Sequence, residues 1–190
     1  MDISFLFFED FEALDVFGPV EVLSELGEAS VHYVSRYGGP VRARQGFRVE
    51  TEKASQVPPG GILLVPGGLG TRRLVNDEEF LGFLRQLCER ADHVLCVCTG
   101  SALLAKAGVL DGMKATSNKR SFEWVMSTSS KVDWIREARW VADGKYYTSS
   151  GVSAGIDMAF GFVGDMFGEE TAEKIAHNIE YALSRPETRG

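Results

Sequence analysis

The sequence has few basic residues and few cysteines, and it has no long apolar run. Lys and Arg number 20 against 27 Asp and Glu, which gives the chain a formal net charge of −7. Because phosphate backbones repel such a chain and the sequence shows no basic cluster, we expect no nucleic-acid partner. The most apolar stretch near the C-terminus is interrupted by Asp157 and Asp165, so we expect no membrane-spanning segment either.

The first residues and the cysteines indicate the compartment. A secretory signal needs a basic start and a cleavage site of small residues, and residues 1–10 have neither. The three cysteines, Cys88, Cys96 and Cys98, are an odd number, which argues against a disulfide framework and for a reducing environment. We therefore expect a cytoplasmic protein.

What the sequence does contain fits one globular domain over residues 1–190. Hydrophobic residues make up 44% of the chain and charged residues 25%, and at this length a core needs no disulfide or metal. Apolar runs that alternate with helix-like segments predict an α/β fold with a mainly parallel sheet and helices on both faces. We expect strands at 3–8, 31–34, 62–65, 93–97, 138–142 and 146–149, and helices at 19–26, 77–90, 100–107, 153–167 and 170–183.

Several of these boundaries depend on single residues. Pro19 is interpreted as the first position of its helix, and Asn76 as the N-cap of the next long helix. Asp143-Gly144 predicts a hairpin between the last two strands. The short alternating pieces in 41–57 are interpreted as an excursion off the main sheet.

We expect the candidate functional residues directly after the strands, because sites in open α/β sheets form beyond the carboxyl ends of the strands. Three such ends are residues 12–15, which lead to Gly18-Pro19, residues 66–70, and residues 98–101. At the third, the positive end of a helix dipole favours the Cys98 thiolate and lowers the pKa of the thiol. Gly100 permits the tight turn that presents a nucleophile. From position alone, Cys98 is equally well a small buried apolar residue.

The residues around Cys98 also allow more than one interpretation. Asp15 either caps a helix, which its local sequence favours, or acts as a catalytic acid whose pKa is raised beside the cysteine. Thr99 either donates its hydroxyl to the same pocket or supports the turn. The backbone N–H groups at the start of the helix after Cys98, with those of Gly67 and Gly68 opposite, would receive charge that develops on a substrate.

Metal and phosphate sites find little support. Cys96 and Cys98 would point to one face of a strand, with Cα atoms at the edge of disulfide reach. With three scattered histidines (His32, His93 and His177), this pair predicts no metal site. The glycines of 67–70 are not followed by the Gly-Lys-Ser/Thr of a phosphate loop, and no cofactor is expected.

Six motifs, in this order, resemble those of the ThiJ/PfpI superfamily, which shares its fold with the class I glutamine amidotransferases. They are Leu14-Asp15-x-x-Gly18-Pro19, Val65-Pro66-Gly67-Gly68-x-Gly70, Val97-Cys98-Thr99-Gly100-Ser101, and residues 107–112, 114–116 and 150–157. The resemblance implies a flavodoxin-like three-layer sandwich with a nucleophile elbow, and a homodimer. It also implies that Cys98 is the nucleophile, that Asp15 and Thr99 are catalytic, and that the substrate or oxyanion side is formed by Gly67, Gly68, Gly151 and Val152.

Within the superfamily, Asp15 and Thr99 resemble the isonitrile hydratase branch, since protease-like and glyoxalase-like members carry glutamate and often histidine at these places. The sequence departs from that branch at Asn118, in a stretch that commonly continues with histidine or another polar group. It also departs at Val152, where isoleucine is usual. We expect these departures to change the shape of the pocket and the substrate.

Three function hypotheses remain. In the first, a cofactor-independent hydratase, Cys98 attacks the terminal carbon of a small isonitrile, Asp15 supplies the proton, and water releases an N-substituted formamide. In the second, a cysteine hydrolase or amidotransferase, His177 and Glu180 complete a triad, although their apolar neighbours predict a solvated helix face for His177. In the third, the domain is no enzyme and senses a ligand, or oxidation of Cys98.

Overall fold

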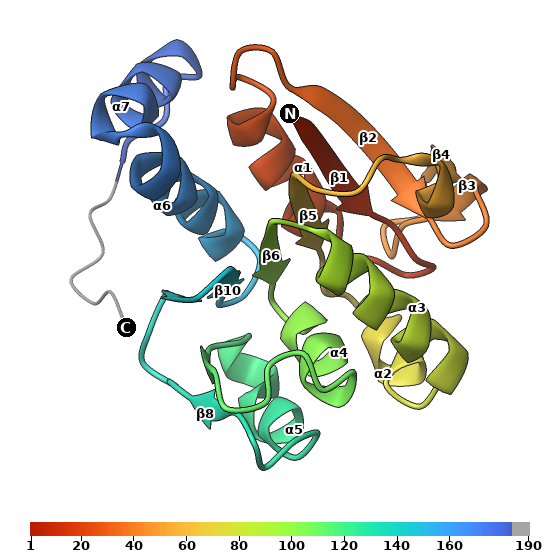
Figure 1. Ribbon diagram of the computed structural model, residues 1–190. Coiled ribbons are helices and arrows are strands. Elements are labelled where there is room, and N and C mark those ends of the chain that lie inside the picture. Colours follow the sequence, from red (N-terminus) through yellow and green to blue (C-terminus); the bar gives the residue numbers. More distant parts are fainter. Residues whose placement is uncertain (184–190) are drawn as a thin grey trace.

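A computed structural model describes residues 1–183, and a sheet of eight strands runs through its middle (Figure 1). Across the sheet the order is β3-β4-β2-β1-β5-β6-β10-β9, and every neighbouring pair is parallel except β3–β4 and β9–β10. The strands are β1 (Asp2–Leu6), β2 (Ser30–Ser35), β3 (Gly39–Arg42), β4 (Arg48–Lys53), β5 (Ile62–Val65), β6 (His93–Val97), β9 (Trp140–Asp143) and β10 (Tyr146–Ser149). Two short strands, β7 (Lys114–Ala115) and β8 (Asp133–Trp134), pair separately.

Helices cover both faces of the sheet. They are α1 (Ala13–Leu23), α2 (Thr71–Leu74), α3 (Glu78–Arg90), α4 (Gly100–Lys106), α5 (Phe122–Met126), α6 (Ala154–Phe167) and α7 (Glu169–Asn178), with 3-10 turns η1 (Ala54–Gln56) and η2 (Lys119–Ser121). On one face α6 packs against α1 and α7, and on the other α4 packs against α2 and α3 (Figure 1). This arrangement confirms the predicted three-layer α/β sandwich. No helix of residues 1–183 is long and apolar enough to cross a bilayer.

The central strands are apolar along their whole length because helices cover both of their faces. All four residues of β5 are buried, and in β6 every residue after His93 is buried. Phe5 on β1, Leu64 on β5 and Leu95 on β6 have no exposed surface. The strands at 62–65, 93–97 and 146–149 have the predicted bounds, and β9–β10 form the predicted hairpin around Gly144.

Helix α1 begins at Ala13, not at Pro19 as predicted, so Asp15 lies in its first turn. Pro19 lies buried inside the helix, where α1 meets α6 at close range. A Cβ on Gly18 would be 2.7 Å from Ile156, and one on Gly155 would be 3.4 Å from the Pro19 ring. The preference of proline for the first helical position is therefore outweighed here by packing between the two helices.

Other boundaries also differ from the prediction. Asp77, not Asn76, caps α3, because its carboxylate accepts from the Phe80 N–H at 2.9 Å. Helix α7 ends at Asn178 rather than at 183. β3 and β4 join the edge of the main sheet through β2 instead of leaving it. The small elements between 114 and 134 are too short to carry a periodic apolar pattern.

Candidate active site

The three predicted strand ends meet at the carboxyl edge of the sheet. Residues after β1 bridge to the loop after β5: the Glu12 N–H donates to the Gly67 carbonyl at 2.9 Å, and Phe11 and Gly68 form an isolated bridge. The Gly67 N–H donates to Oδ2 of Asp15 at 2.9 Å. The Gly68 N–H donates to Oγ1 of Thr99, directly after Cys98, at 3.1 Å. The structure therefore brings together the predicted site residues Asp15, Gly67, Gly68, Cys98 and Thr99.

Cys98 forms a sharp turn between β6 and α4. Its φ of +59° lies in the left-handed region, which is strained for a residue with a side chain. Hydrogen bonds hold it there: its N–H donates to the carbonyls of Ser149 and Ser150, and its own carbonyl accepts from the hydroxyls of Ser101 and Ser117. The strained turn at Cys98 is thus maintained by contacts from neighbouring segments.

The strain at Cys98 predicts an unusual order of stabilities. We expect Cys98→Gly to be more stable than Cys98→Ala by roughly 1 kcal/mol, because glycine adopts a positive φ without steric cost. At Cys96, inside β6, we expect Cys96→Gly to be less stable than Cys96→Ala, since glycine weakens a strand. Urea denaturation of the four variants measures both differences. If the difference in stability between the glycine and alanine variants had the same sign at both positions, the turn at Cys98 would not be strained.

Asp15 is fully buried, and its carboxyl does not cap α1. The N-cap position is Glu12, without a side-chain cap bond, and Oδ2 of Asp15 is turned to the Gly67 N–H instead. Oδ1 is buried and has no hydrogen-bond partner within residues 1–183. Burial, with the Glu12 charge adding to it, raises the pKa of Asp15 to about 7, although the Gly67 N–H and the Cys98 thiol act in the opposite direction.

The pKa of the Cys98 thiol is raised, whereas the sequence predicted that it would be lowered. Burial, with the negative charge of Asp15 adding to it, raises the pKa of Cys98 to about 12. The N–H groups of Thr99 and Val152 and the side chain of Asn118 stabilise the thiolate, but they do not offset the burial. The helix-dipole argument therefore gave the wrong direction, because the sulfur lies in a buried site beside a carboxyl group.

Together Asp15 and Cys98 share one proton over a wide pH range. Between about pH 7 and 12 one group of the pair is protonated and the other is not. A thiol beside a carboxylate can transfer its proton as the sulfur attacks an electrophile, and the carboxylic acid can then pass that proton on. The pair suits chemistry in which one proton moves between a nucleophile and a substrate atom.

Of the N–H groups expected from the sequence on the substrate or oxyanion side, those of Thr99 and Val152 face the sulfur. Those of Gly67 and Gly68 are already bonded to Asp15 and Thr99, whereas those of Thr99 and Val152 point to Cys98. Oγ1 of Thr99 also accepts from the hydroxyl of Thr71 at 3.1 Å, so it supports the loop as well as facing the site. Val152 has a φ of +47°, which is rare for a β-branched residue and turns its N–H toward the site.

Asn118 is a site residue that sequence reasoning did not assign. Its Oδ1 accepts from the N–H groups of Arg120 and Ser121, which caps η2 and leaves the amide nitrogen to face the other way. That nitrogen faces Cys98 and stabilises its thiolate. Gly151 makes room for it, because a Cβ at Gly151 would collide with the amide nitrogen. The signal in the sequence was a polar residue at an unusual place in a motif.

Asn118 gives a prediction that separates chemistry from folding. In Asn118→Asp one oxygen still caps η2, but the other places a negative charge at Cys98 instead of an N–H donor. We expect the rate of Cys98 alkylation at pH 8 to fall about tenfold, since one hydrogen bond to a charged group contributes roughly 1.5–3 kcal/mol. Iodoacetamide labelling followed by mass spectrometry measures the rate. An unchanged rate in a folded variant would show that Asn118 does not act on the sulfur.

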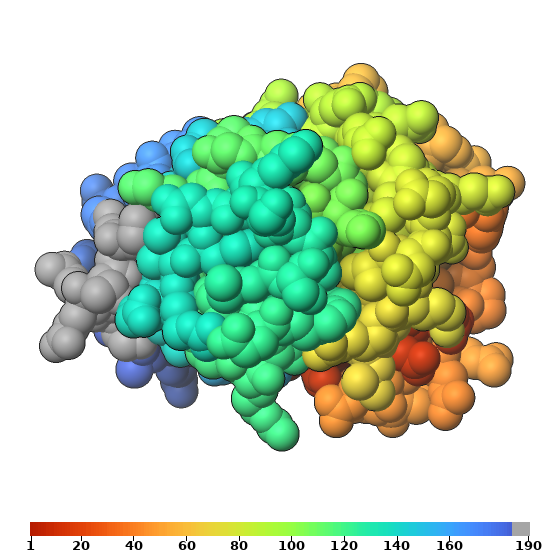
Figure 2. Space-filling model, turned by 90° about the horizontal axis from the view of Figure 1, so that it is seen from below, coloured from red at the N-terminus to blue at the C-terminus, as the bar shows by residue number. Residues whose placement is uncertain are grey.

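Cys98 opens into a cavity of about 360 Å³. Its lining residues are Glu12, Arg44, Gly68, Leu69, Arg72, Cys98, Thr99, Asn118, Arg120, Ser121 and Val152. Seen from below, the red and orange N-terminal segments, the yellow surface around α2 and the green and teal surface from α4 to β8 meet on one face (Figure 2). This is the face at which the carboxyl ends of the parallel strands lie.

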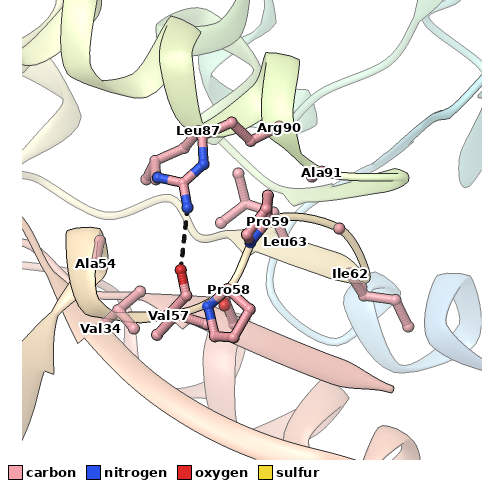
Figure 3. A pocket seen from close by; sticks show the side chains of 12 residues that line it. Val34, Ala54, Val57, Pro58, Pro59, Ile62, Leu63, Leu87, Arg90 and Ala91 are labelled. Atoms are coloured by element: carbon pink, nitrogen blue, oxygen red, sulfur yellow. Dashed lines mark hydrogen bonds between the residues drawn. The ribbon is translucent and has the colours of Figure 1, made fainter.

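Within residues 1–183, neither the histidines nor the small cavity at the other end of the sheet suggests a second centre. His177 is exposed on α7, and no histidine lines the cavity at Cys98, so the described residues form no Cys-His pair there. A cavity of only about 30 Å³ lies at the amino ends of β5 and β6, where Arg90 donates to the Val57 carbonyl (Figure 3). It has no acid, cysteine or histidine. Among residues 1–183 no three His, Cys, Asp or Glu side chains are grouped to hold a metal ion.

Comparison with known proteins identifies the family. The family model described as DJ-1/PfpI matches residues 1–164. The chain belongs to the DJ-1/PfpI family. A ThiJ/PfpI family protein from Pseudomonas syringae has the same fold, with a TM-score of 0.86 and 30% identity over 100% of this chain and 78% of its own. Drosophila melanogaster DJ-1beta shares the fold at 20% identity and a TM-score of 0.80, over 95% of this chain and 98% of its own.

The names of three curated relatives describe different roles. Isonitrile hydratase of Pseudomonas putida is 34% identical over 187 residues, which are 98% of this chain and 81% of that enzyme. A deglycase of Pyrococcus horikoshii is 28% identical over 78% of this chain and 89% of its own. An HTH-type transcriptional regulator of Pseudomonas aeruginosa is also 28% identical, but the 82% of this chain that matches spans 46% of the regulator.

Proposed function

We propose that this DJ-1/PfpI protein is a cofactor-independent isonitrile hydratase in which Cys98 is the nucleophile and Asp15 transfers the protons. The observation that carries the proposal is the Cys98 thiol, which lines a cavity wide enough for a small molecule and has the buried Asp15 carboxyl beside it. The relation to an isonitrile hydratase at 34% identity over nearly the whole chain supports the choice of substrate.

The first step forms a covalent intermediate. The sulfur of Cys98 attacks the terminal carbon of R–N≡C while the S–H proton passes to the Asp15 carboxylate. Asp15 then gives this proton to the same carbon, so that the S–H bond is replaced by new S–C and C–H bonds. The product is a thioimidate, R–N=CH–S–Cys98, and Asp15 is again a carboxylate. A pKa of about 7 suits Asp15 to both halves of this transfer.

The second step is hydrolysis of the thioimidate. The oxygen of a water molecule attacks the carbon while Asp15 accepts a proton from that water. Asp15 then delivers the proton to the nitrogen. The C–S bond then breaks, the hydroxyl proton returns to sulfur, and R–NH–CHO leaves. The N–H groups of Thr99 and Val152 and the amide of Asn118 stabilise the sulfur as it departs. Gly151 holds space for that amide, and Gly67 and Gly68 fix Asp15 and Thr99.

Substrate turnover tests the proposal. The purified protein is mixed with cyclohexyl and 4-nitrophenyl isonitriles, and formamide formation is followed by absorbance and by mass spectrometry. Glyoxal-modified amino acids form the second arm, because deglycases occur among the relatives. We expect formamide from the isonitriles and no release from the glycated amino acids. The opposite result would replace the hydratase by a deglycase, and no turnover of either would favour a sensing role for Cys98.

We also propose that the protein is a cytoplasmic homodimer, which is what we expect from its sequence. Several large apolar side chains are exposed in the single chain, among them Tyr37, Met166 and Phe167. Sedimentation velocity of the purified protein at micromolar concentration gives the mass of the particle in solution. A monomer at all concentrations would contradict the dimer without affecting the proposed chemistry.

A further inference from the structure

The mouth of the cavity at Cys98 is positively charged although the protein as a whole is acidic. Arg44, Arg72 and Arg120 line the cavity together with one acidic side chain, Glu12, whereas the whole chain has a net charge of −7. Glu12 pairs with Arg44, with Oε2 2.8 Å from Nη1. Within residues 1–183, Arg72 and Arg120 have no acidic partner. Two uncompensated guanidinium groups therefore face a cavity in an acidic protein.

Arg72 is held in one orientation by contacts that leave part of its guanidinium free. Its Cζ lies 3.5 Å from the centroid of the Trp124 ring, and one nitrogen donates to the hydroxyl of Ser121 at 3.0 Å. Stacking on an aromatic face leaves the edge of a guanidinium, with its remaining N–H donors, open to a planar acceptor. The Arg72 side chain therefore needs little reordering to bind an anion.

Arg120 lines the same cavity and directly precedes Ser121, to which Arg72 donates. The backbone N–H of Arg120 donates to Oδ1 of Asn118, which caps η2. The amide nitrogen of the same Asn118 faces the sulfur of Cys98. The Arg120 guanidinium makes no hydrogen bond or ion pair with the described residues, although it lines the cavity. Leu69, which is 61% exposed, and Val152 provide apolar lining in the same cavity.

We propose that Arg72 and Arg120 form a carboxylate-binding subsite, and that the isonitriles this protein acts on carry a carboxylate. The identity of the reacting group rests on the proposed function, whereas the subsite rests on the two arginines. The carbon skeleton lies against Leu69 and Val152, with the isonitrile carbon at Cys98 and the carboxylate at the mouth. A paired guanidinium–carboxylate contact selects acids over neutral isonitriles, and the local positive potential speeds their approach.

Binding of a matched acid and ester tests the subsite without requiring turnover. Isothermal titration calorimetry measures the affinity for 4-formamidobenzoate, the expected hydration product of 4-isocyanobenzoate, and for its methyl ester. We expect the acid to bind at least tenfold more tightly than the ester, since charge-assisted hydrogen bonds between a guanidinium and a carboxylate are roughly twice as strong as neutral ones. Arg120→Gln and Arg72→Gln should each reduce that ratio severalfold or more. The control is Arg73→Gln, which makes the same change of charge on α2 outside the cavity lining and should leave the ratio unchanged.

The outcomes separate this proposal from the hydratase. Equal affinity for acid and ester, or the same ratio in wild type, Arg72→Gln and Arg120→Gln, overturns the carboxylate subsite even if neutral isonitriles are hydrated. Tighter binding of the acid that depends on the two arginines supports the subsite. If such binding is found in a protein that hydrates no isonitrile, the hydratase proposal fails and the subsite for small carboxylic acids stands.

Discussion

Replacing Cys98 by serine is expected to lower kcat/KM for isonitrile hydration by roughly 10³-fold or more. The serine hydroxyl keeps the shape of the turn, but it is a far weaker acid than a thiol. Asp15, with a pKa of about 7, can accept a proton from sulfur as the sulfur attacks, but it cannot create an alkoxide in the same buried place. Formamide formation measured against wild type gives the loss.

Cys88 provides the matched control for this substitution. It is buried on α3 and does not line the cavity. Cys88→Ala should therefore lose some stability while keeping kcat/KM close to that of wild type. Thermal unfolding followed by circular dichroism shows whether Cys98→Ser is folded when its activity is measured. Wild-type turnover in Cys98→Ser, or an equal loss of activity in Cys88→Ala, would contradict a covalent role for Cys98.

Replacing Asp15 by asparagine is expected to lower kcat/KM by about 10²- to 10⁴-fold, the usual contribution of a positioned acid or base. In wild type the active pair carries one proton, so kcat/KM should rise with pH through about 7 and stay level above it. Asparagine can still accept from the Gly67 N–H, but it does not titrate. The rise near pH 7 should therefore disappear together with most of the activity. A variant with the same pH profile as wild type would assign that titration to another group.

The same substitution should increase stability in alkaline solution. The native state holds Asp15 with a pKa of about 7, against 3.8 for an unperturbed carboxyl. Between these values the unfolded chain loses its proton while the native state keeps it, so this carboxyl destabilises the fold increasingly as pH rises. Above pH 7 the cost is on the order of 4 kcal/mol. Asp15→Asn should melt higher than wild type at pH 8 and close to it at pH 3.5.

Buried central strands were the part of the fold that the sequence predicted best. The runs at 62–65 and 93–97 are apolar throughout because both faces of the sheet are covered, and their bounds agree with the structure. The start of α1 could not be found in this way. Its N-cap Glu12 and Asp15 in its first turn are polar and interrupt the apolar pattern, and its buried Pro19 follows the packing against α6. Function and tertiary contacts overrode the local preference at that point.

The site was predicted in its residues more fully than in its electrostatics. The turn at Cys98, the nearness of Asp15 and the raised pKa of Asp15 follow from strand ends that meet at one edge of a sheet. The raised pKa of Cys98 could not be predicted in this way, because it depends on how completely later segments bury the sulfur. Asn118 acts on Cys98 from a segment without periodic pattern, so only the folded chain places it there.

The proposed chemistry depends most on the proton that Asp15 and Cys98 share, and the pH dependence of Cys98 alkylation tests this sharing directly. Iodoacetamide labelling of Cys98 is followed by mass spectrometry from pH 5 to 10 in wild type and in Asp15→Asn. We expect the wild-type rate to rise through pH 7 and then level off, and we expect the Asp15→Asn rate to show no step there. The same titration curve in both proteins would show that Asp15 does not exchange a proton with Cys98.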